Sequence, residues 1–286
     1  DPAGIGYTAA RSSQLQFERF TVAVPASHKN PGEARSQMQT DPLKKYTVMG
    51  RQHITFKDIN ADKDILIYVH GYNYSFQESL FQAAKVASDG KLSEMPILFS
   101  WPSEGSVTGY VADKDAAIYA RDDLVQLLQD LKKRRTKSRV TLFGHSMGAW
   151  LVVEGLRQRK ISGQEDVLQR IDQVVLAAPD IDVDLFKRQV DTIGPLAHPI
   201  IVLNSTDDRA LAISGRIGGS RTRLGSIDKE SVDIQELLIS KKIEIVDLSK
   251  YGSPDETRHN RFSILINIIS VINSDKIKFI RDKYST

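Results

Sequence analysis

The sequence of 286 residues contains no cysteine. Disulfides, cysteine-ligated zinc, iron–sulfur clusters and a thiol nucleophile are therefore excluded. Long hydrophobic runs are missing as well. The longest candidate, residues 264–272, is interrupted by Asn267 and Ser270 and falls short of the roughly 18 residues needed to cross a bilayer. We therefore expect no transmembrane segment.

Neither sign of charge is in excess, because 39 Lys and Arg face 36 Asp and Glu, giving a formal net charge of +3. A nucleic-acid-binding domain is typically basic on one face, so no nucleic-acid partner is expected. The sequence also lacks His-Glu-x-x-His, Gly-x-x-x-x-Gly-Lys and an Asp-rich calcium loop. We expect no cofactor and no metal.

Apolar segments of two periodicities alternate along most of the chain, and the length suffices for a sizeable core. Strands are predicted at residues 16–24, 46–56, 64–70, 96–101, 139–143, 172–178, 199–203 and 243–248. Helices are predicted at residues 75–87, 115–133, 147–159, 184–190 and 261–283. This order predicts one α/β domain, with a mostly parallel sheet, helices on both faces and an antiparallel amino-terminal edge. Residues 1–14 are expected to be irregular.

The segment Gly144-His-Ser-Met-Gly148 lies between a predicted strand and a predicted helix. In that position, Gly-x-Ser-x-Gly is typical of a nucleophile elbow, a tight turn that exposes the serine hydroxyl at the edge of the sheet. The glycines are expected because the turn leaves no room for a Cβ atom. Ser146 is the predicted nucleophile.

A serine nucleophile needs a base, and in this architecture the histidine follows the serine and the acid in the chain. The six histidines are at positions 28, 53, 70, 145, 198 and 259. Only two of them follow Ser146. His198 precedes a strand and is expected at the opposite edge of the sheet, whereas His259 follows the last strand. His259 is therefore the predicted base.

Three carboxylates are candidates for the acid that orients His259. Asp180 follows one late strand, while Asp207 and Asp208 follow the next. The later strand is the usual donor, which favours the pair Asp207 and Asp208. Asp208 is our choice of the two, with Asp180 as the alternative. Each of the three is also a candidate helix N-cap.

The developing oxyanion needs two backbone N–H donors. One is expected from Met147, the residue after the nucleophile, and the other from Tyr72 in the loop that follows the third strand. Gly71 lets that backbone approach the substrate, whereas His70 is expected to brace the loop. Trp101, at the end of its strand, is a candidate for lining the acyl pocket, and simple packing is the equal alternative.

The Gly- and Arg-rich stretch 214–229 interrupts the alternation of strands and helices. Long loops of this kind are often lids or binding segments. We expect this loop, with Arg221 and Arg223, to cover a polar or anionic substrate.

Several motifs together resemble a bacterial family of α/β-hydrolases of unknown function within the esterase/lipase superfamily. They span about residues 15 to 275. The motifs are His-Gly-Tyr-Asn at 70–73, Phe-Ser-Trp-Pro-Ser at 99–103, Gly-His-Ser-Met-Gly at 144–148, Leu-Ala-Ala-Pro-Asp at 176–180, Ser205-x-x-Asp208-x-Ala210-Leu211, and Ile245-Val-Asp-Leu-Ser before His259.

The resemblance implies an α/β-hydrolase fold and a Ser–Asp–His triad, and it places the acid on Asp208 rather than Asp207. Family members usually have Gly before the histidine, where this chain has Arg258. The expected activity is hydrolysis of small-molecule carboxylic esters. Thioesterase or acyltransferase activity on the same triad, and a non-catalytic binding protein of this fold, are the alternatives.

The chain begins at Asp1 rather than Met. Removal of a signal peptide would place the protein in the bacterial periplasm or cell envelope, and a cytoplasmic location is the alternative. The sequence does not decide between them, and it predicts no oligomeric state.

Overall fold

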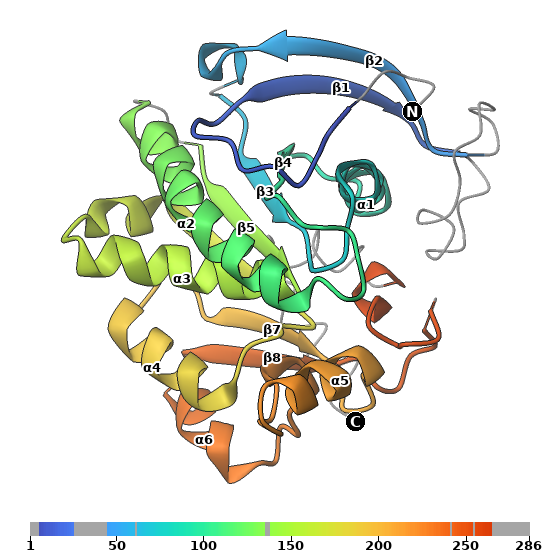
Figure 1. The fold of residues 1–286 in the computed structure, drawn as a ribbon. Helices are drawn as coiled ribbons and strands as arrows, with labels where there is room; N and C mark the ends of the chain where they lie inside the picture. Colours follow the sequence, from blue (N-terminus) through green and yellow to red (C-terminus); the bar gives the residue numbers. More distant parts are fainter. Residues whose placement is uncertain are drawn as a thin grey trace.

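The computed structural model describes residues 6–25, 45–60, 62–134, 138–240, 242–253 and 255–264. Its centre is a six-stranded sheet of order β4-β3-β5-β6-β7-β8, in which every neighbouring pair is parallel (Figure 1). The strands are β3 (Ile65–Val69), β4 (Met95–Phe99), β5 (Val140–His145), β6 (Ile171–Ala177), β7 (Ile200–Asn204) and β8 (Ile243–Asp247). The predicted parallel sheet is confirmed.

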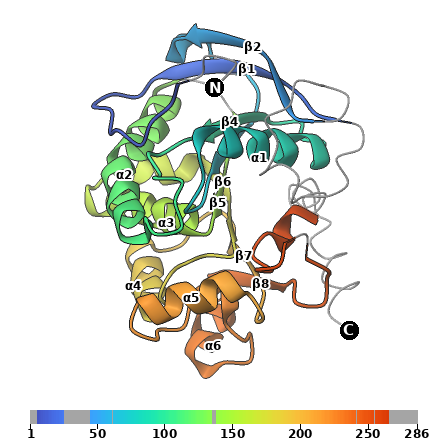
Figure 2. The same ribbon diagram turned by 45° about the vertical axis from the view of Figure 1, so that its right-hand side comes forward.

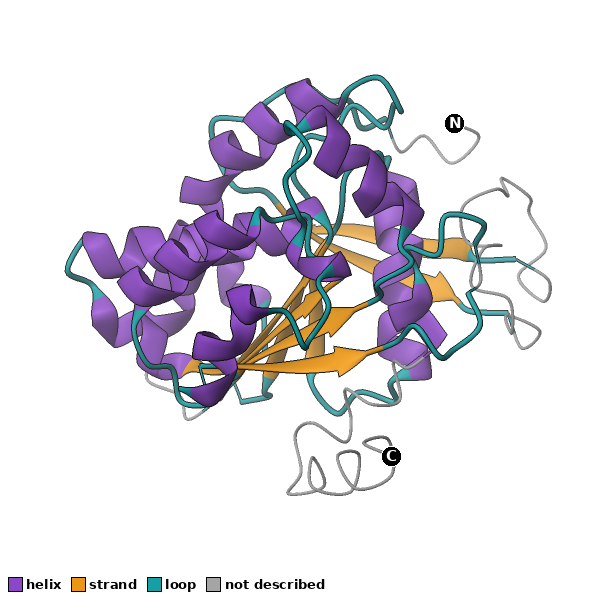
Figure 3. Cartoon of the chain, turned by 90° about the horizontal axis from the view of Figure 1, so that it is seen from below, coloured by secondary structure: helices purple, strands orange, loops and turns teal. Residues whose placement is uncertain are grey.

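Helices cover both faces of this sheet, as the view along it shows (Figure 3). They are α1 (Phe76–Asp89), α2 (Tyr110–Lys133), α3 (Met147–Ile161), α4 (Val183–Ile193), α5 (Arg209–Ile217) and α6 (Val232–Ile239). Short 3-10 turns lie at Phe56–Asp58, Glu165–Arg170, Leu224–Ser226 and Arg261–Ile264.

Strand β3 shows why both faces must be covered, because all five of its residues are buried. Ile65 and Ile67 belong to the larger core, which they share with apolar residues of α2, α3, α4 and α6. Leu66 and Tyr68 point to the other face and belong to a smaller core with residues of α1 and Phe262. A strand that is apolar on both sides is typical of a parallel sheet between two helical layers.

The amino-terminal strands β1 (Phe17–Ala23) and β2 (Thr47–Ile54) pair antiparallel, as predicted. In the described residues they form a two-stranded sheet of their own rather than an edge of the main sheet (Figure 1). Val22 and Val48 pack with Phe81 of α1, which fixes the pair to the body of the protein.

Two predicted helices have bounds that differ from those in the structure. Helix α2 begins at Tyr110, five residues before the predicted start at 115, and its N-cap Gly109 has no capping side chain. This start therefore carries no sequence signal of the usual kind. Of the predicted helix 261–283, Arg261–Ile264 form a 3-10 turn, and the remainder lies outside the described residues.

Because the six strands run in one direction, the loops that follow them lie at the same edge of the sheet (Figure 2). The candidate residues that follow these strands are His70–Asn73 after β3, Trp101 after β4, Ser146 after β5, Asp180 after β6, Asp207 and Asp208 after β7, and His259 after β8. His198 lies instead before β7, at the opposite edge, 3.8 Å from Asp172.

Candidate active site

Ser146 occupies the turn between β5 and α3 in a strained conformation, with φ +52° and ψ −118°. A non-glycine residue held at positive φ costs on the order of 1 to 3 kcal/mol, and such strain is concentrated at functional sites. Three backbone bonds hold it: the Ser146 amide donates to Ala177 O at 2.9 Å, and Ser146 O accepts from Ala149 N at 3.1 Å and from Asp180 N at 3.2 Å. The residue is 5% exposed.

The glycines on either side of Ser146 are required by close backbone contacts. A Cβ on Gly144 would lie 2.5 Å from the Cα of Ala149, and one on Gly148 would lie 2.2 Å from the carbonyl oxygen of His70. Both neighbours are main chain and cannot move aside. The start of α3 is therefore pressed against the end of β3, which brings the loop after β3 to the nucleophile.

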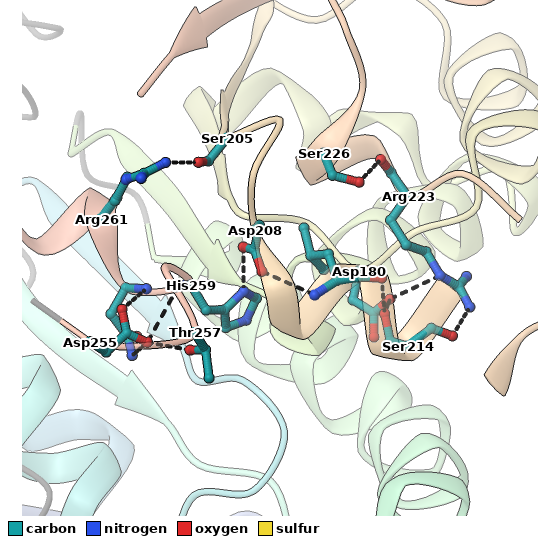
Figure 4. Close-up of polar contacts among 12 residues, drawn as sticks. Asp180, Ser205, Asp208, Ser214, Arg223, Ser226, Asp255, Thr257, His259 and Arg261 are labelled. Carbon is teal, nitrogen blue, oxygen red and sulfur yellow. Dashed lines mark hydrogen bonds and ion pairs between the residues drawn. The ribbon is translucent and has the colours of Figure 1, made fainter. Parts of the chain in front are cut away.

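His259 forms the central side-chain contact of the site, in which its Nδ1 lies 2.7 Å from Asp208 Oδ2 (Figure 4). The Asp208 side chain is fully buried. Its other oxygen, Oδ1, accepts from Leu211 N at 3.0 Å and caps α5. The cap and the histidine thus use one oxygen each, and the cap fixes the direction in which the carboxylate faces His259.

The imidazole of His259 lies beside the elbow. Its ring centroid is 4.9 Å from that of His145, the residue before the nucleophile. The His145 ring also packs against Phe262, at 4.6 Å, and meets Tyr74 edge-on at 6.0 Å. The structure thus places His259, bound to Asp208, against the residue that precedes Ser146, with contributions from the loops after β8, β7 and β5.

Two opposing effects act on the pKa of His259. Burial lowers it, whereas the negative charge and hydrogen bond of Asp208, with smaller contributions from Asp180 and Asp255, raise it. The net result is a raised pKa, so the surrounding carboxylates stabilise the imidazolium form. That form is the one a general base reaches when it takes a proton.

Asp255 organises the loop that carries His259, a role that the sequence reasoning missed. Its carboxylate accepts from the Thr257 hydroxyl (Figure 4). It also accepts from Ser253 Oγ at 2.8 Å and from Asn260 N at 3.2 Å. Burial raises the pKa of Asp255, but these hydrogen bonds lower it by more. The pattern Ser253-x-Asp255-x-Thr257 is the signal that could have predicted this turn.

Arg258, which replaces the glycine usual in the family, has a φ of +61°. Glycine adopts that conformation without strain, which explains the family preference. Here the guanidinium donates to Asp207 Oδ2 at 2.6 Å. Asp207 also accepts from Arg261, at 2.9 Å through Nη2, and this hydrogen bond holds the pKa of Asp207 well below its usual range. Asp207 therefore joins the loop after β7 to the histidine loop.

Asp180 has different partners from Asp208. Its carboxylate accepts from the hydroxyls of Tyr110 and Ser214, both at 2.8 Å, and lies 3.2 Å from Arg223 Nε. Arg223 and Asp180 are both 5% exposed, so they form a buried ion pair (Figure 4). The negative charge of Asp180 contributes to the raised pKa of His259.

The prediction that residues 214–229 form a loop covering the substrate is wrong in part. Residues 214–217 belong to α5, and Arg223 is buried against Asp180 rather than directed toward solvent. Arg221 is exposed and lies 3.7 Å from Asp184. The ion pair could not be foreseen because its members come from separate parts of the chain.

The loop after β3 lies directly against the nucleophile. A Cβ on Gly71 would lie 3.0 Å from the Cβ of Ser146 and 3.0 Å from His145 Nδ1. Tyr72 follows at this point, and Met147 is 1% exposed at the start of α3. Of the two amides predicted for an oxyanion hole, that of Met147 directly follows Ser146, and that of Tyr72 directly follows the glycine that lies against Ser146.

His70 and Trp101 pack against each other. Their rings are stacked at 4.8 Å, and the Trp101 indole N–H donates to His70 O at 2.9 Å. His70 Nδ1 bonds Gly71 O at 2.9 Å, which braces the loop as expected. Trp101 is 2% exposed, a position that matches the packing alternative.

Burial of His70 predicts a pH dependence of stability. Burial lowers its pKa to about 4, against 6.5 for a free histidine. Below pH 6.5 the unfolded chain takes up a proton that the folded protein refuses, so stability is lost as the pH falls. Between pH 7 and 4.5 the loss is about 2 to 3 kcal/mol. The raised pKa of His259 acts with the opposite sign, because the folded state takes up that proton more readily, and this contribution is common to the wild type and His70→Gln.

Urea unfolding of the wild type and of His70→Gln at the two pH values measures this loss. Carboxylates titrate in both proteins, so the difference between the two drops isolates His70. Equal drops in the two proteins would show that His70 is not held neutral by burial.

The fold and the elbow define an α/β hydrolase. The family model of α/β hydrolases of unknown function (DUF900) matches residues 50–275, and the chain belongs to this family. An uncharacterized protein from Nostoc sp. (strain PCC 7120) is 24% identical over 167 residues, which are 43% of this chain and 43% of that protein. The match thus spans less than half of that relative.

Solved esterase structures are also similar to the chain. A lipase/esterase from Lactobacillus plantarum has 13% identity and a TM-score of 0.45, with 80% of this chain and 89% of that chain covered. Esterase B from Lactobacillus rhamnosis has 12% identity and a TM-score of 0.44, with 94% and 88% covered. Within the described part of the chain, no helix is long and apolar enough to cross a membrane.

Proposed function

We propose that this α/β hydrolase cleaves carboxylic esters through an acyl-enzyme, with Ser146 as nucleophile, His259 as base and Asp208 as the orienting acid. One observation carries the proposal. His259 Nδ1 lies 2.7 Å from a fully buried Asp208, and the same imidazole lies beside the strained turn of Ser146. These contacts support the assignment, because the three residues follow strands that end at one edge of the sheet and occur in the chain order Ser, Asp, His.

In the acylation step, Ser146 Oγ attacks the ester carbonyl carbon while Nε2 of His259 takes the hydroxyl proton. Asp208 holds Nδ1–H, so that Nε2 is the nitrogen free to act as base, and its charge stabilises the imidazolium. The tetrahedral intermediate collapses as the bond from carbon to the alcohol oxygen breaks. His259 gives its proton to that oxygen, and the alcohol leaves.

Deacylation repeats these steps with water. His259 takes a proton from the water molecule, the resulting hydroxide attacks the acyl carbon, and the bond to Ser146 Oγ breaks. The proton returns to the serine, and the carboxylic acid is released. No cofactor is needed at any step.

We assign the stabilisation of the oxyanion in both intermediates to the backbone N–H groups of Tyr72 and Met147. A Cβ on Gly71 would lie 3.0 Å from the Cβ of Ser146, and this close approach supports the assignment for the loop after β3. Met147 contributes the first amide of α3, where the helix dipole favours negative charge. Preorganised donors of this kind lower the barrier because they need no reorientation during the reaction.

Hydrolysis of p-nitrophenyl esters with graded acyl length tests the proposal. We expect turnover that His259→Ala lowers on the order of 10⁴-fold or more. His198→Ala is the matched control, because His198 is exposed at the opposite edge of the sheet, and it should retain wild-type rates. A folded wild-type protein without turnover of any ester would refute the proposal. Parallel assays with thioesters and with alcohol acceptors distinguish the thioesterase and acyltransferase alternatives.

A further inference from the structure

Asp113 is a fully buried carboxylate outside the triad, with 0% exposure. It lies in the first turn of α2 and accepts three hydrogen bonds. Its Oδ2 accepts from Asn73 N at 3.2 Å and from Ser103 Oγ at 2.6 Å, and its Oδ1 accepts from Glu104 N at 2.7 Å. A single carboxylate therefore joins the loop after β3 to the loop after β4.

The residue that Asp113 holds comes directly after Tyr72. Asn73 has a φ of +59°, a conformation that non-glycine residues adopt at a cost unless contacts enforce it. Its amide bond to Asp113 is such a contact. Fixing Asn73 N also fixes the peptide plane between Tyr72 and Asn73. The Tyr72 N–H lies in the preceding plane, whose carbonyl oxygen, Gly71 O, bonds His70 Nδ1 at 2.9 Å.

Two further contacts from the same segment hold Tyr72. Its hydroxyl donates to the carbonyl oxygen of Val107, and its ring meets the Tyr110 ring edge-on at 5.4 Å. Tyr110 in turn donates to Asp180, whose amide donates to Ser146 O. The segment 103–113 is therefore linked both to Tyr72 and, through Asp180, to the elbow.

We propose that Asp113 is a positioning residue for the oxyanion hole: its carboxylate holds the backbone of Tyr72 and Asn73 so that the Tyr72 amide faces the substrate oxygen above Ser146. The proposal rests on the proposed ester hydrolysis. Asp113 acts through the loop and takes no proton from the substrate. A carboxylate suits the task because each of its three partners is a donor, and both of its oxygens accept.

The substitution Asp113→Asn keeps the size of the side chain but places an NH₂ group where one oxygen accepted. One of the N–H or O–H groups that donated to Asp113 then faces this NH₂ group, which is also a donor, and the loop must shift. Asp115→Asn is the matched control, because it makes the same change of charge on an exposed side chain two residues further along α2. Circular dichroism and thermal unfolding show whether each variant is folded.

We expect Asp113→Asn to lower kcat for p-nitrophenyl esters on the order of 10²-fold, since displacement of one oxyanion donor has effects of this size. KM and the apparent pKa of the pH–rate profile should stay near wild type, because the substrate-binding surface and the His259–Asp208 pair are unchanged. Asp115→Asn should match the wild type in all three quantities.

A thionoester, in which sulfur replaces the carbonyl oxygen, separates positioning from general destabilisation. Sulfur accepts hydrogen bonds weakly, so an intact oxyanion hole favours the oxygen ester. The ratio of the oxygen-ester rate to the thionoester rate should fall in Asp113→Asn and stay constant in Asp115→Asn. If Asp113→Asn does not fold, Tyr72→Phe, which removes only the tether to Val107, should shift the ratio in the same direction.

An unchanged ratio in a folded Asp113→Asn protein, or an unchanged ratio in Tyr72→Phe where that variant stands in, would overturn the inference. If the wild-type protein does not hydrolyse esters, or if Ser146→Ala still hydrolyses them, the proposed function is refuted instead. The two failures are therefore distinguishable in one set of assays.

Discussion

Ser146→Ala should lower kcat for ester hydrolysis on the order of 10⁴- to 10⁶-fold without loss of fold. The hydroxyl is the group that forms the acyl-enzyme, and no neighbouring side chain can replace it. Alanine keeps the Cβ atom, so the strained backbone at φ +52° stays as it is in the wild type. Steady-state kinetics with p-nitrophenyl esters at saturating substrate concentration measure the residual kcat.

Ser162→Ala is a suitable control for this substitution, because Ser162 is an exposed serine at the carboxyl end of α3, the end away from the elbow. It should hydrolyse esters at the wild-type rate. Equal rates in Ser146→Ala and the wild type would mean that the observed hydrolysis does not use the elbow.

The second large effect is expected at the acid. Asp208→Asn should lower kcat about 10⁴-fold, because an amide in place of the carboxylate holds the imidazole in the wrong tautomer and removes the charge that stabilises the imidazolium. Burial would then dominate at His259, and its pKa should fall rather than rise. The acid limb of the remaining pH–rate profile is expected to move to lower pH.

The other two candidate acids serve as comparisons. Asp180→Asn disturbs the buried pair with Arg223, and Asp207→Asn breaks contacts to Arg258 and Arg261, so both should destabilise the protein. Neither carboxylate bonds the imidazole, and neither change should equal the loss of turnover in Asp208→Asn. A larger kcat loss in folded Asp180→Asn would move the triad acid to that residue.

The elbow was predictable because its signal is local. Gly144, Ser146 and Gly148 lie within five residues, and the apolar strand before them and the helix after them are both visible in the sequence. Parallel topology then places the loops after the other strands at the same edge, so the position of His259 follows from strand order alone. The same reasoning put His198 at the opposite edge, where the structure has it.

The choice among the acids was harder, because all three follow strands that end at the active-site edge. What separates Asp180 from Asp208 is a partner far along the chain, namely Arg223 for the first and His259 for the second. A role as helix N-cap does not exclude a role as triad acid, because Asp208 caps α5 with one oxygen and bonds His259 with the other. Periodicity and spacing do not show such pairings.

Two supporting residues were missed for different reasons. Asp255 binds its own loop through short-range bonds, and the turn pattern around it would have revealed that role. Asp113 lies in a helix whose start lacks a capping side chain, so the sequence placed it before the predicted helix. Its partners, Asn73 and Glu104, lie on separate loops and meet only in the folded protein.

The most direct test of the account is covalent labelling with a fluorophosphonate, followed by peptide mapping. An activated serine reacts with this reagent, whereas a serine without a base does not react at a useful rate. We predict one adduct per chain, on the peptide that contains Ser146, and its loss in His259→Ala. An unlabelled protein, or an adduct on another serine, would contradict the proposed triad.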